Sequence, residues 1–93
     1  MSHYYAVCEP DDSGGFWISF PGRDGITSAA ASAGQIVFQA QDALETVLMY
    51  EGTPAELPPS IEDGARPPVD LSDYDKPLVV VIPFEPATAA RAA

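Results

Sequence analysis

The chain has 93 residues and a formal net charge of −10, with 14 acidic residues against four basic ones. This length suits one small domain and is too short for two, and the shortage of Lys and Arg argues against binding to a nucleic-acid backbone. The charge favours a basic protein partner, because complementary charge speeds association. Acidity can also serve simply to keep a small protein soluble.

Cysteine usage and the start of the chain bear on cellular location. Cys8 is the single cysteine, so an internal disulfide is impossible, and a free cysteine within a strand ordinarily behaves as a small buried hydrophobic residue. The first residues lack the basic and apolar regions of a secretion signal. The longest apolar run, residues 78–82, is too short to cross a bilayer. We therefore expect a soluble cytoplasmic protein.

Residues 4–21 predict a β-hairpin. Two runs rich in aromatic and β-branched residues flank a connection at residues 10–15, which consists of Pro, Asp, Ser and Gly. Side chains alternate along the second run, so Trp17 and Ser19 should share one face. The opposite, buried face should carry Phe16, Ile18 and Phe20.

A weak third strand and a helix follow. Residues 22–25 predict a turn, and residues 26–29 a short strand. A helix is predicted over residues 32–51, because Ser32 and Gln35 have the spacing of a capping box and Gly52 followed by Pro54 is a stop signal. Its apolar stripe consists of Ile36, Ala40, Ala43, Leu44, Val47 and Leu48.

The last third of the chain is rich in proline. Residues 53–76 alternate Pro with Glu and Asp, which predicts an extended surface segment with one helical turn at residues 60–63. Residues 78–82 predict a strand by their β-branched content, and Pro83 is expected to end it. Residues 87–93 are expected to be a frayed tail or the start of a further module.

This order of elements predicts an α+β fold of βββαβ type, with a three-stranded antiparallel meander and one main helix. Because a helix and a long crossover precede the last strand, about residues 78–83, we expect it beside the first strand and parallel to it. The run 78–82 is apolar at every position, so both of its faces need cover. One helix covers one face, and another copy or a partner would cover the second, unless one or two exposed valines are tolerated.

Catalytic and metal-binding patterns are weak. His3 is the single histidine and has no nucleophile arranged with it, no Cys/His cluster suits zinc, and no glycine-rich loop leads into a helix. The acidic residues Glu9, Asp11, Asp12 and Asp24 could gather at strand ends around Mg²⁺, although exposed turn carboxylates are ordinarily solvated. We therefore predict no catalytic residue, no metal and no cofactor.

Trp17 has two interpretations. It can be an exposed aromatic anchor, since tryptophan is enriched at the energetic centres of interfaces. It can equally be a satellite of the core, covered by the segment 53–76. The sequence leaves both open.

The ordered set of motifs resembles the N-terminal domain of HicB-family antitoxins. It comprises a first strand ending in Glu-Pro-Asp, the run Gly-Gly-Phe-Trp-Ile-Ser-Phe-Pro, a helix with Ala-x-x-Ala-Leu, and then Glu-Gly and Pro-Pro-Ser. The matching pieces are residues 5–10, 14–21, 35–48 and 51–60, together with the valine strand 78–82.

The resemblance implies a partial ribonuclease-H-like fold without nuclease chemistry. Family members neutralise a small basic HicA toxin, an mRNA-cleaving ribonuclease, by covering its active site. They usually continue into a C-terminal DNA-binding module, for which the residues after 86 are too few, so we expect no direct DNA binding by this chain unless such a module is missing from it. Residues 25–31 are richer in alanine than is usual in the family.

The leading hypothesis is an antitoxin domain at residues 1–86 that occludes a HicA-like toxin. Asp11, Asp12 and Asp24 would meet Lys or Arg of the toxin, and Trp17 would be the aromatic anchor. A homo-oligomer, dimer or tetramer, is also expected. The alternatives are a metal-dependent ribonuclease-H-like nuclease and a non-catalytic oligomeric scaffold.

Overall fold

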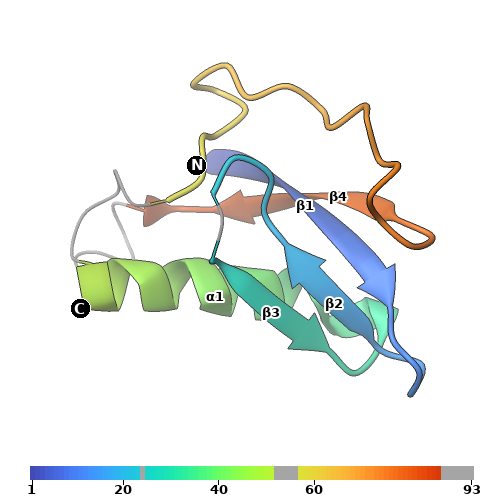
Figure 1. Cartoon of the computed structure of the whole chain (residues 1–93). Coiled ribbons are helices and arrows are strands. Elements are labelled where there is room, and N and C mark those ends of the chain that lie inside the picture. The colour runs from blue at the N-terminus through green and yellow to red at the C-terminus, as the bar shows by residue number, and fades with distance from the viewer. Residues whose placement is uncertain (24, 52–56, 87–93) are drawn as a thin grey trace.

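The structure is a computed structural model that describes residues 1–23, 25–51 and 57–86. A four-stranded antiparallel sheet packs one face against a single α-helix (Figure 1), which confirms the α+β class and the three-stranded meander. The strands lie in the order β3-β2-β1-β4. The elements are β1 (Ser2–Pro10), β2 (Phe16–Ser19), β3 (Thr27–Ala30), a 3₁₀ helix (Ala33–Gln35), α1 (Ile36–Glu51) and β4 (Leu78–Phe84). No helix in the described ranges is both long and apolar enough to span a membrane.

The predicted hairpin is confirmed. β1 and β2 pair in antiparallel register from Val7 opposite Ser19 to Pro10 opposite Phe16. The connecting turn closes where the Asp11 amide donates to the Gly15 carbonyl at 2.9 Å. Gly14 has φ of +91°, a conformation that L side chains rarely adopt. The turn-forming residues identified in the sequence therefore form the turn of this hairpin.

Gly15 is required because β3 passes close to it. A Cβ at this position would lie 2.3 Å from the Ala30 carbonyl oxygen. We expect Gly15→Ala to lower the free energy of unfolding by about 1–3 kcal/mol through forced backbone shifts, as measured by urea denaturation. Gly34→Ala is the matched control, because its Cβ would meet nothing closer than 4.0 Å. Equal stability of the two variants would contradict this prediction.

The helix begins later than predicted. Ser32 makes no side-chain capping bond, so the expected capping box is wrong. Instead, its carbonyl accepts from the Gln35 amide at 3.1 Å within the 3₁₀ turn, and the α-helix starts at Ile36. A tight first turn satisfies this amide through the backbone, which leaves the hydroxyl unused. The predicted stop at Gly52 and Pro54 lies outside the described residues.

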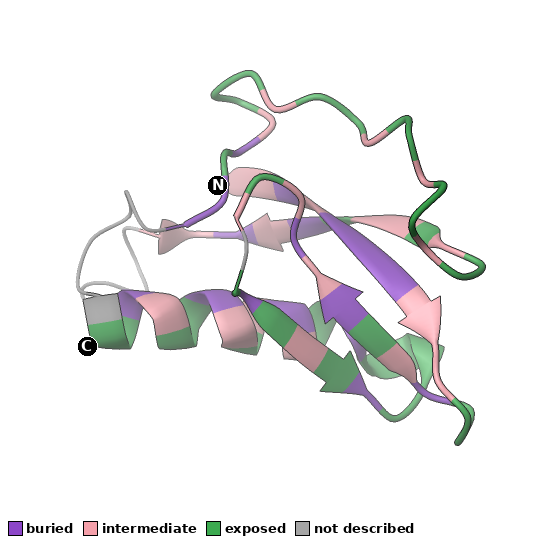
Figure 2. Cartoon of the chain, in the orientation of Figure 1, coloured by how far each residue is buried: buried purple, intermediate pink, exposed green. Residues whose placement is uncertain are grey.

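The core lies between α1 and one face of the sheet, as the purple bands in Figure 2 show. The predicted helix stripe is confirmed, with Ala43 and Val47 half-buried and its other members buried. Tyr4 and Phe84 meet edge to face at 6.3 Å between ring centroids. Cys8 is fully buried, and burial raises the pKa of its thiol. The cysteine is therefore a packing residue, as predicted.

β4 lies beside β1 as predicted, but it runs antiparallel to it, so the expected parallel orientation is wrong. Ser2 faces Phe84 at one end of the ladder and Cys8 faces Leu78 at the other. The reason is the path of the segment 57–77, which travels the length of the sheet before β4 begins. The Ile61 amide donates to the His3 carbonyl at 2.8 Å, and the Asp75 amide donates to the Glu9 carboxylate at 2.9 Å.

The same segment lies on the side of the sheet away from α1 (Figure 1). Val7 points to this side, since its neighbours Ala6 and Cys8 point into the α1 core, and yet it is fully buried. The expectation that another copy or a partner covers the second face of the run 78–82 stays a prediction. On that face Val81 is 47% exposed, whereas Leu78, which is 46% exposed, lies on the α1 side opposite Cys8.

Pro83 lies inside β4 and does not end it, contrary to prediction, since the strand continues to Phe84. Pro83 faces His3, whose N–H and C=O bond to Glu62 and Ile61 of the segment 57–77. The ladder therefore loses no hydrogen bond through the missing N–H of proline.

Candidate partner-binding surface

The sheet face away from α1, here called the outer face, carries the predicted anchor. Its side chains belong to His3, Tyr5, Val7, Glu9, Trp17, Ser19, Thr27, Ala29, Val79, Val81 and Pro83. Trp17 is 60% exposed and stands between Glu9 on β1 and Ala29 on β3. The segment 57–77 does not bury it, so the interpretation as a satellite of the core is wrong. An indole this exposed is available for contact.

Asp11 organises its own turn. Its Oδ1 accepts from the Ser13 amide, the Ser13 hydroxyl and the Gly15 amide, each at 2.8 Å. The Ser13 hydroxyl and then the backbone amides lower the pKa of this carboxyl, which holds it ionised. Asp12 is exposed in the same turn. Asp11 therefore shapes the turn that presents Asp12.

Of the four predicted contact residues, the structure describes Asp11, Asp12 and Trp17, and these do not gather at one point. Asp24 lies outside the described residues, and its neighbours Arg23 and Gly25 belong to the β2–β3 connection. That connection is at the opposite end of β2 from the turn with Asp11 and Asp12. Trp17 lies on the face between these two ends. The described residues also hold no group of three His, Cys, Asp or Glu side chains suited to a metal ion.

A hollow of about 360 Å³ opens between the β2–β3 connection and the segment 57–77. Ser19 and Thr27, which face each other across β2 and β3 on the outer face, belong to its lining. The remaining lining consists of Phe20, Pro21, Gly22, Arg23, Gly25, Ile26, Pro68, Asp70 and Tyr74. Sequence reasoning missed Pro68, Asp70 and Tyr74 as site residues, because it predicted only an extended surface segment at residues 53–76.

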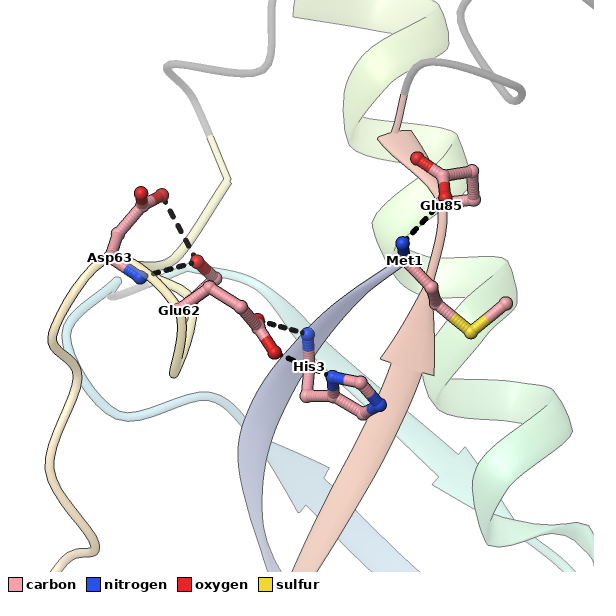
Figure 3. A network of polar contacts seen from close by, with 6 residues as sticks. Met1, His3, Glu62, Asp63 and Glu85 are labelled. Carbon is pink, nitrogen blue, oxygen red and sulfur yellow. Dashed lines mark hydrogen bonds and ion pairs between the residues drawn. The ribbon is translucent and has the colours of Figure 1, made fainter.

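Polar contacts hold the segment 57–77 against β1 at two places. Near the start of β1, Glu62 accepts from the His3 amide and from His3 Nδ1, each at 2.7 Å (Figure 3). The terminal amine of Met1 pairs with Glu85 at 3.0 Å in the same region. At the far end of β1, the Glu9 carboxylate holds the Asp75 amide. These contacts fix the segment that borders the hollow.

Glu62 makes this attachment sensitive to acid. The His3 ring and then the His3 amide lower the pKa of Glu62 from 4.5 to about 2. A carboxyl group whose pKa is lower in the folded than in the unfolded state stabilises the fold at any pH above its unfolded pKa. For Glu62 this contribution is lost as the pH falls from 4.5 toward 2. We expect Glu62→Gln to have a lower melting temperature than the wild type at pH 6, with the gap closing by pH 2. The effect will be modest because both side chains are substantially exposed. A gap that does not change with pH would contradict the assignment.

The side of α1 away from the sheet carries a second exposed surface. Phe38, Met49 and Tyr50 are 67%, 64% and 85% exposed. Asp42 and Glu45 are exposed on the same helix. This surface was not predicted, because the sequence stripe identified the buried side of the helix only. It offers a second aromatic site against which the role of Trp17 can be tested.

The structure thus defines a small α+β domain whose accessible features are aromatic side chains and carboxylates. Comparison of the sequence with protein-family models and with curated proteins gives no match.

Solved structures, in contrast, are clearly similar. A chain of the HicA3 and HicB3 toxin-antitoxin complex has a TM-score of 0.60 at 23% identity, covering 89% of this chain and 98% of that one. The crystal structure of antitoxin HicB3 has a TM-score of 0.64 at 27% identity, covering 91% of this chain. This chain spans 63% of the length of that antitoxin chain. The chain therefore has the fold of the HicB antitoxins, which confirms the resemblance found in the sequence.

Proposed function

We propose that this chain is an antitoxin that binds a HicA-like ribonuclease toxin in the cytoplasm and neutralises it by covering its active site. The observation that carries the proposal is the structural match to antitoxin HicB3 over 91% of the chain. The similarity to a chain of the HicA3 and HicB3 complex supports a toxin of the HicA kind as the partner.

The charge of the chain supports inhibition by binding. A net charge of −10 complements a small basic toxin and would speed encounter between the two. Strands β2, β3 and β4 hold no carboxylate, and the one in β1, Glu9, accepts a bond from Asp75. Metal-dependent nuclease chemistry needs clustered acids on adjacent strands, so this arrangement favours a binding role without catalysis.

Trp17 is the proposed centre of the contact. Burial of its exposed indole against the toxin would supply apolar area, and Asp12 and Asp24 would meet Lys or Arg of the toxin. Asp11 contributes by holding the turn through its three hydrogen bonds. The hollow beside Ser19 and Thr27 extends this contact area along the same face.

The test is an RNA-cleavage assay with the cognate HicA-like toxin, sought first in the neighbouring reading frame. Cleavage should fall to background once the chain is present in stoichiometric excess. Unchanged cleavage at saturating concentration would reject the antitoxin role. The chain alone with Mg²⁺ serves as the second arm, in which RNA cleavage would support the nuclease alternative. A chain that self-associates and forms no complex with toxin would support the scaffold alternative.

A further inference from the structure

β4 is an edge strand, and its backbone groups can be assigned to one side or the other. In β1, the N–H and C=O groups of the odd-numbered residues point toward β2 and the segment 57–77. This orientation follows from His3, whose N–H donates to Glu62 and whose C=O accepts from Ile61. The Asp11 amide, which bonds to Gly15, continues the same alternation. The even-numbered residues of β1 therefore bond to β4. Their partners are Leu78, Val80, Ile82 and Phe84.

The residues between these partners direct their N–H and C=O groups away from the sheet. They are Val79, Val81 and Pro83. Pro83 has no N–H, and its carbonyl accepts from Gln41 Nε2 of α1 at 2.7 Å, so this end of the edge is closed. No hydrogen bond to the outward groups of Val79 and Val81 is present within the described ranges of the chain.

The open part of the edge is apolar. No residue of β4 is charged, and Leu78 and Val81 are both nearly half exposed. An uncharged, apolar edge with free backbone groups is a template for a further strand. A basic partner would need carboxylates here, and the carboxylates of β1 and its turn lie elsewhere. The apolar, uncharged character of this edge therefore favours pairing with another apolar, uncharged strand.

We propose that the β4 edge at Val79 to Val81 pairs antiparallel with the same edge of a second copy of this chain. With the two-fold axis at Val80, Val79 of each copy faces Val81 of the other, and the four outward groups of each copy are satisfied reciprocally. This proposal goes beyond the antitoxin function and does not depend on the toxin.

The geometry of this contact also limits the assembly to two copies of the chain. Pro77 and Pro83 bound the open stretch, which limits the pairing to about five residues. The axis is perpendicular to the sheet, so both α1 helices lie on the same face. Val37, one turn from Gln41, is 38% exposed on the flank of α1 nearest this edge and would approach its counterpart. Once both β4 edges are used, the contact is isologous and ends at a dimer.

The first test is sedimentation equilibrium in about 0.5 M salt, which screens the repulsion between two chains of charge −10. We expect twice the chain mass of 9.8 kDa. Val81→Lys should raise the dimer dissociation constant at least tenfold, because the charge would lie beside the axis. Val69→Lys is the matched control, since this valine is 91% exposed away from the edge and should leave the dimer intact. A monomeric wild type, or two variants that dimerise equally, would overturn the proposal.

The second test uses the unmodified chain, so it does not depend on how the variants fold. In amide exchange followed by NMR, Val80 and Ile82 should be protected at every concentration, because they bond to β1. Val79 and Val81 should be protected at high concentration and exchange at least tenfold faster after dilution to the monomer. Fast exchange of these two amides in a sample that is dimeric by sedimentation would place the interface elsewhere.

Discussion

Replacing Trp17 with alanine should weaken binding to the HicA-like toxin by about 2 kcal/mol or more, roughly a thirtyfold increase in Kd. The side chain is 60% exposed and packs at no core position, so its removal should leave the fold nearly unchanged. What is lost is the apolar area that the indole would bury against the toxin. Isothermal titration calorimetry measures the affinity, and circular dichroism verifies that the variant folds.

Phe38→Ala is the matched control for this prediction. Phe38 is 67% exposed, also aromatic, and lies on α1, which covers the other face of the sheet. It should bind toxin as the wild type does. If Phe38→Ala weakens binding and Trp17→Ala does not, the contact lies on α1 and the antitoxin role still stands. If neither variant changes the affinity, the exposed aromatics are not the anchors.

The local elements of the fold could be read from the sequence because their signals are local. The hairpin follows from alternation around a turn of Pro, Asp, Ser and Gly, and the helix stripe from Ile36 to Leu48 follows from helical spacing. The direction of β4 could not be read in this way. It depends on where the segment 57–77 attaches, and those attachments join residues 58 positions apart at His3 and Ile61 and 66 positions apart at Glu9 and Asp75.

The same distinction applies to the candidate surface. The alternation of side chains along β2 correctly predicted that Trp17 lies on the face opposite the core, because the two-residue repeat of a strand alone determines the face. The hydrogen bonds of Asp11 follow from an Asp-x-Ser turn and could have been predicted from its spacing. The hollow lined by Asp70 and Tyr74 could not, because it forms only when a segment without regular structure returns to the sheet.

Leu44→Ala should produce the largest loss of stability of any single change considered. Leu44 is fully buried in the middle of α1 and belongs to the core that joins the helix to β1 and β4. Truncation of a buried leucine removes its transfer free energy and leaves a cavity, which costs about 2–5 kcal/mol. A domain of this length has about 5–14 kcal/mol of stability in total, so this one change removes a large share of it. Guanidinium denaturation followed by circular dichroism measures the loss.

Leu78→Ala is the control of identical chemistry at the edge of the sheet. Leu78 is 46% exposed, so less area returns to water and no closed cavity forms. We expect a loss below about 1 kcal/mol. If the two variants lose equal stability, α1 is not packed on the sheet as described. The packing of α1 on the inner face of the sheet supports the outer face that carries Trp17. The Leu44→Ala variant should therefore also release toxin near the temperature at which the variant unfolds. Leu78→Ala should keep the toxin inhibited up to the melting temperature of the wild type.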